Sequence, residues 1–223
     1  MHSKLFLDIG NTNTKWRYQG KYFVIPTEEF NYDKLQKSSV IWASSVAPHS
    51  LDLKKNHVNF VQSQHKYKSL VNTYKEPHNL GSDRWLGMIA CYEKSMDRSF
   101  ILLDIGSAIT IDIVNKRGIY QGGLIYPGLE KIRLIFDNFP VAYYENINAI
   151  GQSTEECWSI GTLSLIVNEI NQKIIEFHRQ FPDAEIYTTG GGYSNIQKFL
   201  NFPNNYYENL VLDGLELFVN NMG

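Results

Sequence analysis

The stretch LFLDIGNTNTKWRY, residues 5–18, combines an apolar strand, a tight turn and a second strand. Its apolar beginning leads into Asp8, and Gly10–Thr14 form the turn. Backbone N–H groups, hydroxyls and amides in such a turn suit phosphate oxygens, and the Asp can hold a cation that bridges them. The same residues are also ordinary hairpin chemistry, because Gly and Asn tolerate positive φ. Taken alone, the stretch leaves both interpretations open.

A second copy of this pattern begins at Phe100, where residues 100–120 read FILLDIGSAITIDIVNKRGIY. The segment Leu7–Gly10 recurs as Leu103–Gly106, and a Thr stands six residues after the Asp in both copies. An internal repeat on this scale indicates a duplicated domain. Two facing copies would direct two Asp-tipped hairpins at one ligand, which is the geometry that phosphoryl transfer from a nucleotide needs.

The composition narrows the class of protein. The 223 residues allow one large domain or two of about 100 residues each. Hydrophobic residues make up 43% of the chain, enough for a packed core, and the net charge of −2 gives no argument for nucleic-acid binding. The only cysteines, Cys91 and Cys157, lack metal-binding spacing, so we expect reduced thiols and no zinc site. Without a signal peptide or an apolar run of about 18 residues, the expectation is a cytoplasmic protein with no membrane span.

Hydrophobic patterning predicts an α/β order with an antiparallel meander at its start. We place the domain boundary between residues 98 and 99. Predicted strands cover 5–18 in two segments, 21–26, 40–43, 58–61, 100–105, 108–114, 119–126 and 184–188. Predicted helices cover 31–37, 49–56, a segment from 82, a segment after 128, about 154–179, a segment from about 195, and 210–220.

The helix from residue 82 begins with two charged residues that have two interpretations. Ser82 is a natural N-cap, and Asp83 in the first turn complements the helix dipole. Arg84 is a cation at the same end, which is unfavourable unless it has a partner. Asp83 and Arg84 are therefore either parts of a helix start or a base with an anion clamp.

Two glycine clusters add to the pattern. Thr189–Gly192 follow a strand and precede a helix, an arrangement that accommodates a nucleotide or is a turn without a ligand. Gly122 and Gly123 permit close backbone approach, to a substrate or to a neighbouring strand. A P-loop, a GxGxxG fingerprint and a protein-kinase catalytic loop are all absent, so these classes of nucleotide site are excluded.

With these motifs in this order, the chain resembles the type III pantothenate kinases of the acetate and sugar kinase/heat-shock-70/actin superfamily. The resemblance covers nearly the whole chain. The matching motifs are Asp8–Thr12 with Lys15, then Tyr74, Pro77 and Gly81–Arg84, then Asp104–Thr110, Gly122–Gly123, Pro127–Gly128, Thr154–Glu156 and Thr189–Gly191.

The resemblance implies an α/β fold of two similar ribonuclease H-like, actin-like domains with a cleft between them, and a homodimer. It implies ATP-dependent phosphorylation of pantothenate to 4'-phosphopantothenate, the first step of coenzyme A biosynthesis. Asp83 is then the general base, Asp104 binds a monovalent cation (K⁺ or NH₄⁺), and Mg²⁺ accompanies ATP near Asp8. The implied ATP-binding residues are Asp8, Gly10, Asn11, Thr12, Asn13, Thr14, Lys15, Ser107, Gly190 and Gly191. The implied substrate-binding residues are Tyr74, Gly81, Ser82, Asp83, Arg84 and, across the dimer, Thr154.

The chain departs from the family pattern at Ser107 and Ile109, where Thr is usual. Ser keeps a hydroxyl, whereas Ile109 shares a strand face with residue 107 and is expected to pack in the core. Two other functions stay open: another small-molecule kinase of the same superfamily, and a non-catalytic accessory protein in transcription. The substrate segment from Tyr74 to Arg84 distinguishes the first, and the complete set of acidic residues argues against the second.

Overall fold

Two sheets of the same design form the protein. The structure, a computed structural model, describes residues 4–36, 40–46 and 58–222. The first sheet has the order β3-β2-β1-β4-β5 and the second β10-β9-β8-β11-β12. In each, three strands form an antiparallel meander, a fourth strand pairs in parallel with the first strand of the meander, and a fifth pairs in parallel with the fourth. The first sheet comprises β1 Lys4–Ile9, β2 Asn13–Tyr18, β3 Lys21–Pro26, β4 Val40–Ser45 and β5 Val58–Phe60, and the second β8 Phe100–Ile105, β9 Ala108–Val114, β10 Tyr120–Pro127, β11 Glu185–Thr189 and β12 Asn205–Tyr206.

The repeated LDIG segments occupy equivalent places in these sheets. Leu7–Ile9 end β1 and Leu103–Ile105 end β8, each strand lying at the centre of its sheet. Their alternating apolar side chains are buried on both faces, as the run of apolar residues requires. The predicted duplication of the α/β unit is therefore confirmed by the strand order.

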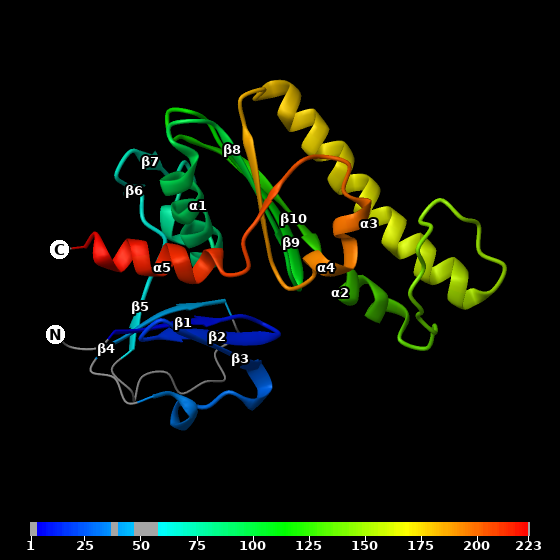
Figure 1. Ribbon diagram of the computed structural model, residues 1–223, viewed down its shortest axis with the longest axis horizontal. Helices are drawn as coiled ribbons and strands as arrows, with labels where there is room; N and C mark the ends of the chain where they lie inside the picture. Colours follow the sequence, from blue (N-terminus) through cyan, green and yellow to red (C-terminus); the bar gives the residue numbers. More distant parts are fainter. Residues whose placement is uncertain (1–3, 37–39, 47–57, 223) are drawn as a thin grey trace.

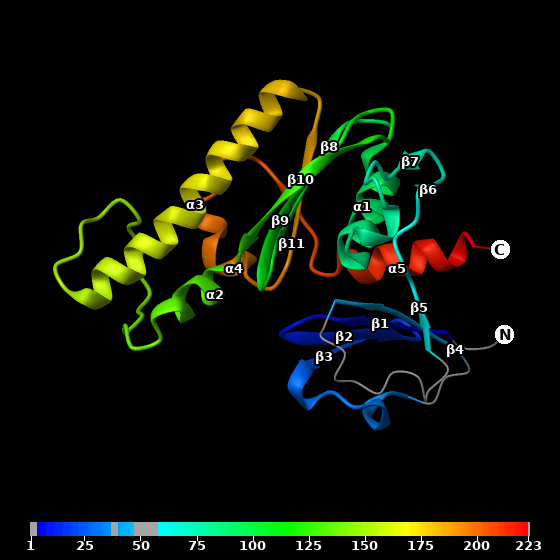
Figure 2. The ribbon, with the colours of Figure 1, turned by 180° about the vertical axis from the view of Figure 1, so that it is seen from behind.

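A pair of helices, α1 Ser82–Ser95 and α5 Leu210–Asn220, packs between the two sheets (Figures 1 and 2). Each helix follows the last strand of its copy, and their apolar faces belong to one core with Phe100 and Leu102 of β8. A Cβ on Gly214 of α5 would lie 1.9 Å from the Leu86 carbonyl oxygen of α1, so glycine permits this close approach. The helix pair is thus the joint that connects the two copies.

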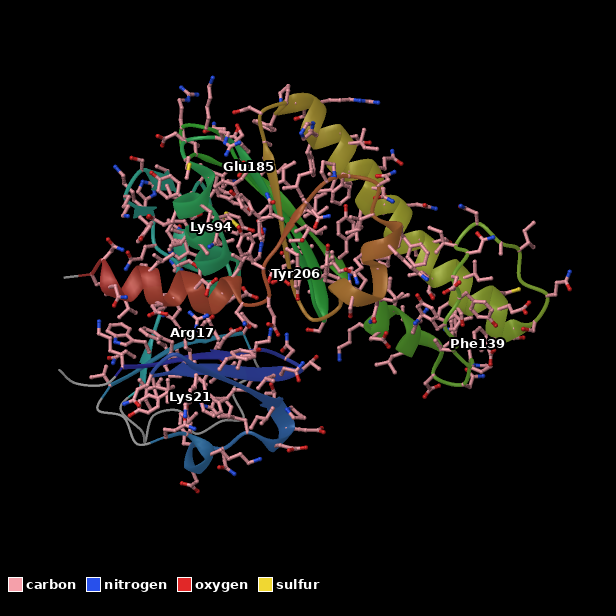
Figure 3. All side chains as sticks on the ribbon, viewed as in Figure 1. Arg17, Lys21, Lys94, Phe139, Glu185 and Tyr206 are labelled. Carbon is pink, nitrogen blue, oxygen red and sulfur yellow. The ribbon has the colours of Figure 1, made fainter. Side chains whose placement is uncertain are left out.

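Ion pairs support this joint at the surface. Arg17 of β2, labelled in Figure 3, lies between the first sheet and α5. Its guanidinium donates to Asp213 Oδ1 at 2.7 Å and to Glu216 Oε2 at 2.9 Å. These contacts fix α5, an element of the second copy, onto the sheet of the first.

The second copy carries additional helices on its outer face, where they bury one side of its sheet. The longest, α3 Thr154–Gln180, begins with a Ser153 cap whose hydroxyl accepts from the Glu156 amide at 3.1 Å. No helix among the described residues is long and apolar enough to cross a membrane. The remaining elements are α2 Leu129–Arg133, α4 Tyr193–Ile196, the short hairpin β6 Lys66–Tyr67 and β7 Leu70–Val71, and the 3-10 turns η1 Thr27–Glu29, η2 Tyr32–Lys34, η4 Pro77–Asn79, η5 Leu134–Phe136 and η6 Gln197–Phe199.

Most predicted elements are present, with ends shifted by one or two residues. The helix predicted over residues 31–37 is wrong, because the described part of this range holds only the single 3-10 turn η2. The helix predicted over 49–56 lies outside the described residues. The domain boundary at 98/99 falls between α1 and β8 and stays a prediction.

Candidate active site

A cavity of about 160 Å³ lies where the two sheets, the β11–α4 turn and the start of α5 meet. Asp8, Asp83 and Asp104 all line this one cavity, although they come from three separate parts of the chain. The lining residues are Asp8, Gly10, Asn11, Thr12, Asn13, Lys15, Val46, Asp83, Asp104, Gly106, Ser107, Ala108, Thr110, Thr189, Gly190, Gly191 and Glu208–Leu212.

Two equivalent hairpin turns form opposite walls of the cavity. The Gly10 amide donates to the Asn13 carbonyl at 3.1 Å, and the Gly106 amide donates to the Ala108 carbonyl at 2.9 Å. In each copy, the Asp that stands two residues before the turn glycine lies at the carboxyl end of a central strand. Lys15 stands opposite Asp8 in the β1–β2 register, which adds a cation to the first wall. Together the walls present amides, hydroxyls and one ammonium group to the space between them.

The carboxylates of the cavity repel one another. Shielding from water and the charge of Asp83 raise the pKa of Asp8 to about 7, against the lowering effect of Lys15. The same two causes raise the pKa of Asp104 to about 7. Burial also raises the pKa of Asp83, opposed by the Arg84 amide and guanidinium. The site therefore has an excess of negative charge that a cation would relieve.

The turn after β11 forms a third wall. Gly190 has φ of +99°, and a Cβ there would lie 2.3 Å from the Ile105 carbonyl oxygen and 2.5 Å from Asp104 Oδ1. The Gly192 amide donates to the Ile105 carbonyl at 2.8 Å, which ties this turn to the end of β8. The glycines predicted for a nucleotide thus bring backbone directly against the second Asp-tipped strand.

Asp83 reaches the cavity from the first turn of α1. Gly81 is the N-cap of this helix, so the prediction that Ser82 caps it is wrong. The Ser82 hydroxyl instead lies 2.9 Å from the Ser44 hydroxyl of β4. Asp83 Oδ1 accepts from the Arg84 amide at 2.7 Å, which satisfies one of the free N–H groups at the helix start.

Arg84 points away from Asp83 into a buried polar cluster. Its Nε and Nη2 donate to the two carboxylate oxygens of Asp112 at 3.1 and 2.6 Å. Nη2 also donates to the Tyr120 hydroxyl at 2.8 Å, and Nη1 to the Tyr74 hydroxyl at 3.0 Å. The ion pair with Asp112 of β9 explains why a cation is tolerated in the first turn of α1. Four of the five guanidinium N–H groups have a protein acceptor.

Sequence reasoning missed Asp112 and Tyr120. A signal for Asp112 was present, since an acidic residue in the apolar strand ITIDIV needs a buried partner. At the equivalent place in the first copy, eight residues after Asp8, stands Trp16. The repeat therefore gave no indication of a functional residue at position 112.

The predicted site residues divide into two groups. Those that line the cavity are Asp8, Gly10, Asn11, Thr12, Asn13, Lys15, Asp83, Asp104, Ser107, Gly190 and Gly191. Those that do not are Thr14, Tyr74, Gly81, Ser82, Arg84 and Thr154.

Two members of the second group have other surroundings. Thr14 is fully buried, with its hydroxyl 3.1 Å from that of Thr27, and supports the hairpin from behind. Thr154 is the exposed first residue of α3, and this helix lies on the side of the second sheet away from α1 (Figure 1). Ile109 is 1% exposed in the core of the second copy, as expected, but Ser107 lies in the turn before β9 and not on a shared strand face.

The donors fit a cation that brings its own further ligands. No group of three or more His, Cys, Asp or Glu side chains in the described part of the chain is arranged to hold a metal ion. Asp8 and Asp104 each offer one carboxylate to the cavity, and the Ile105 carbonyl oxygen lies near that of Asp104. Such sites suit Mg²⁺ carried by phosphates, which keeps several waters and takes one or two protein carboxylates.

Solved structures share this fold. A protein from Campylobacter jejuni assigned to the Baf family of transcriptional activators aligns with a TM-score of 0.69 at 23% identity, over 98% of both chains. A protein of Sinorhizobium meliloti assigned as a 2-dehydro-3-deoxygalactonokinase aligns with a TM-score of 0.62 at 7% identity, over 98% of this chain and 96% of the other. MreB 5 of Spiroplasma citri bound to AMPPNP aligns with a TM-score of 0.51 at 11% identity, over 100% and 97%. The predicted actin-like fold is thereby confirmed.

Sequence comparison identifies the family. The model of type III pantothenate kinases matches residues 4–176. The type III pantothenate kinase of Alcanivorax borkumensis is 31% identical, over 95% of this chain and 96% of its own length. That of Hahella chejuensis is 32% identical, over 97% of both chains. The chain therefore belongs to the type III pantothenate kinase family.

Proposed function

We propose that the cavity transfers the γ-phosphoryl group of ATP to the primary hydroxyl of pantothenate, with Asp83 as the general base. The family supports the kinase activity and its place at the first step of coenzyme A biosynthesis. The observation that carries the residue assignment is that Asp8, Asp83 and Asp104 line one cavity between two equivalent hairpin turns.

The two hairpins and the β11–α4 turn hold the nucleotide in this proposal. Amides and side chains of Gly10–Asn13 and Ser107 face the phosphates from opposite walls, and Gly190 and Gly191 lie against the nucleoside. Lys15 supplies the positive charge next to Asp8. Asp8 would hold the Mg²⁺ that accompanies ATP, and this ion would neutralise charge on the transferred group. Thr14 supports the turn from behind and makes no contact with ATP.

Asp83 accepts the proton of the attacking hydroxyl. A general base works best when its pKa lies near the working pH, and burial moves the pKa of Asp83 in this direction. Because phosphoryl transfer needs little covalent help, the main tasks of the protein are positioning and charge neutralisation. Asp83 and Asp104 line the same space, so the acceptor and the nucleotide can meet there.

Asp104 is the proposed ligand of a monovalent cation, K⁺ or NH₄⁺. Burial and the nearby Asp83 raise its pKa, so a cation would stabilise the carboxylate, and the Ile105 carbonyl oxygen lies beside it. Backbone carbonyl oxygens can replace the hydration shell of K⁺, so the Ile105 carbonyl beside the carboxylate supports this assignment.

We further propose a homodimer formed through the outer face of the second copy. Large apolar side chains of α3 and of the segment after α2 are exposed there: Leu134 is 63% exposed, Ile135 66% and Leu165 61%. Exposed apolar area of this extent marks an interaction surface. Thr154 belongs to the same outer face, so a second chain is what would bring it to a substrate. Replacing Leu165 by Glu should turn a dimer into a monomer in multi-angle light scattering. An unchanged mass would contradict this interface.

A coupled assay with ATP, Mg²⁺ and pantothenate tests the activity, with 4'-phosphopantothenate identified by mass. We expect turnover that needs both substrates and is faster in K⁺ than in Na⁺. Asp83→Asn is the matched control, since it keeps the size of the side chain and removes the base. Phosphorylation of a sugar or small acid in place of pantothenate would favour another kinase of the superfamily. Absence of turnover with every acceptor would favour the non-catalytic alternative.

A further inference from the structure

Arg84, Asp112 and Tyr120 form a polar cluster that is almost completely buried. Asp112 is 0% exposed and Arg84 8%, and they form a bidentate ion pair. The Tyr120 hydroxyl donates to Asp112 Oδ1 at 2.7 Å while accepting from Arg84, which closes a ring of three groups. A buried ion pair is weak evidence for stability, because loss of hydration offsets its attraction. A role in fixing geometry explains the cluster better.

A glycine on the neighbouring strand leaves room for this ion pair. Gly123 of β10 stands opposite Asp112 in the β9–β10 register. A Cβ at Gly123 would lie 2.5 Å from Asp112 Oδ1 and 2.8 Å from Arg84 Nη2. Of the two meanings that the sequence left open for Gly122 and Gly123, the structure assigns Gly123 to close contact with a neighbouring strand and its ion pair.

The cluster and a second anchor hold Asp83 from two sides. On one side, the Ser82 hydroxyl lies 2.9 Å from that of Ser44, in the first sheet. On the other side, Arg84 is held by Asp112, in the second sheet. Asp83, which faces the cavity, therefore lies between a neighbour that contacts the first copy and a neighbour that contacts the second. The direction of its carboxylate depends on both contacts.

We propose that Asp112 is a positioning residue for phosphoryl transfer: it orients the first turn of α1 through Arg84, and so directs the Asp83 carboxylate into the cavity. This inference rests on the proposed function of Asp83 as the base. Asp112 itself does not line the cavity, so it acts only through its neighbours.

Two variants disturb the cluster in different ways. Asp112→Asn removes the charge and keeps the shape, and Gly123→Ala keeps all three polar side chains but pushes them apart. We expect each to lower kcat by roughly 10- to 100-fold and to change the KM for ATP by less than about threefold, because misplacement of the base affects the chemical step. Asp213→Asn is the matched control, since it breaks another Asp–Arg pair between the copies, at a residue that does not line the cavity. Its kcat should stay within about twofold of the wild type.

The readouts separate this role from a merely structural one. All variants are assayed well below their melting temperatures, and Asp112→Glu should recover part of kcat because it restores the charge. If both Asp112→Asn and Gly123→Ala keep kcat within threefold while Asp83→Asn is inactive, the positioning role is overturned and the proposed function stands. A rise in KM alone also overturns it. Should Asp112→Asn fail to fold, Gly123→Ala decides. If Asp83→Asn keeps normal turnover, the proposed function itself fails.

Discussion

Replacing Asp104 by Asn should stabilise the protein without bound ligands, and more so as the pH rises. The ionised form of Asp104 destabilises the folded chain, because its carboxylate is largely shielded from water and lies near the charge of Asp83. The asparagine keeps the size of the side chain, and its neutral amide avoids the repulsion. The expected gain therefore appears only where the wild-type residue is ionised.

The magnitude follows from the pKa. A folded-state pKa of about 7, against 3.8 for the free side chain, corresponds to about 4 kcal/mol at 25 °C. The residue as a whole is only half-buried, although burial is the main cause of the shift, and it shares its repulsion with Asp83. Screening and coupling therefore reduce the gain to about 1–2 kcal/mol. For a chain of this size this raises Tm by about 3–6 °C.

The sign follows from proton binding. Well below pH 3.8 the carboxyl is protonated in both the folded and the unfolded chain, and the wild type loses nothing. Between pH 4 and 7 the unfolded chain releases its proton first, so wild-type stability falls with rising pH. Asp104→Asn should therefore approach the wild type as the pH falls below 3.8 and exceed it most at pH 8.

Thermal unfolding followed by circular dichroism at pH 4.5, 6 and 8 checks this, in a tetramethylammonium buffer without Mg²⁺ or nucleotide. Asp213→Asn is the control, because it removes a favourable ion pair and should lower Tm similarly at pH 6 and 8. An Asp104→Asn shift of equal size at pH 4.5 and 8, or a lower Tm at pH 8, would refute the reasoning.

The other predictions concern turnover and packing. Asp83→Asn should lower kcat by about 10²–10⁴-fold in the coupled assay with little change in Tm; near-normal turnover would remove Asp83 from its role. Gly190→Ala should cost about 2–4 kcal/mol in urea unfolding, because of its positive φ and its contact with Asp104, whereas Gly191→Ala has no atom within 4 Å and should be near neutral. Equal stability of these two variants would contradict the close approach. Gly214→Ala should also destabilise by about 2–4 kcal/mol by pushing α5 away from Leu86, while Gly161→Ala in α3 meets nothing within 4 Å and should add up to about 1 kcal/mol. A Gly214→Ala variant as stable as the wild type would show that the helix pair tolerates separation.

Much of the fold was predictable because its signals are local. The apolar spacing of residues 210–220 determines both the type and the ends of α5. The repeated LDIG motif places Asp8 and Asp104 at equivalent strand ends, and duplication brings these ends to one cavity. In the glycine-rich turn at residues 190–192, Gly190 has a positive φ, a backbone conformation that most other residues avoid.

The sequence-based predictions failed where contacts between residues far apart in the chain determine the structure. The helix predicted over 31–37 does not form, because Phe30 packs on Trp16 and the Trp16 Nε1 donates to Gln36 Oε1 at 2.9 Å, which holds the backbone of Asn31 and Leu35 extended. The partner of Arg84 lies 28 residues away on another strand, so no helix-start rule could name it.

The equivalence of α1 and α5 has a consequence for how the site arose. Each copy ends in a helix with an apolar stripe, and the two stripes pack against each other at the centre of the molecule. A single ancestral unit with such a stripe would be unstable in water by itself, and pairing with an identical unit would bury it about a twofold axis. In such a pair both acidic strand ends would line one shared cavity, as Asp8 and Asp104 do here, so a single self-association would account for both the buried stripes and the paired Asp-tipped strands.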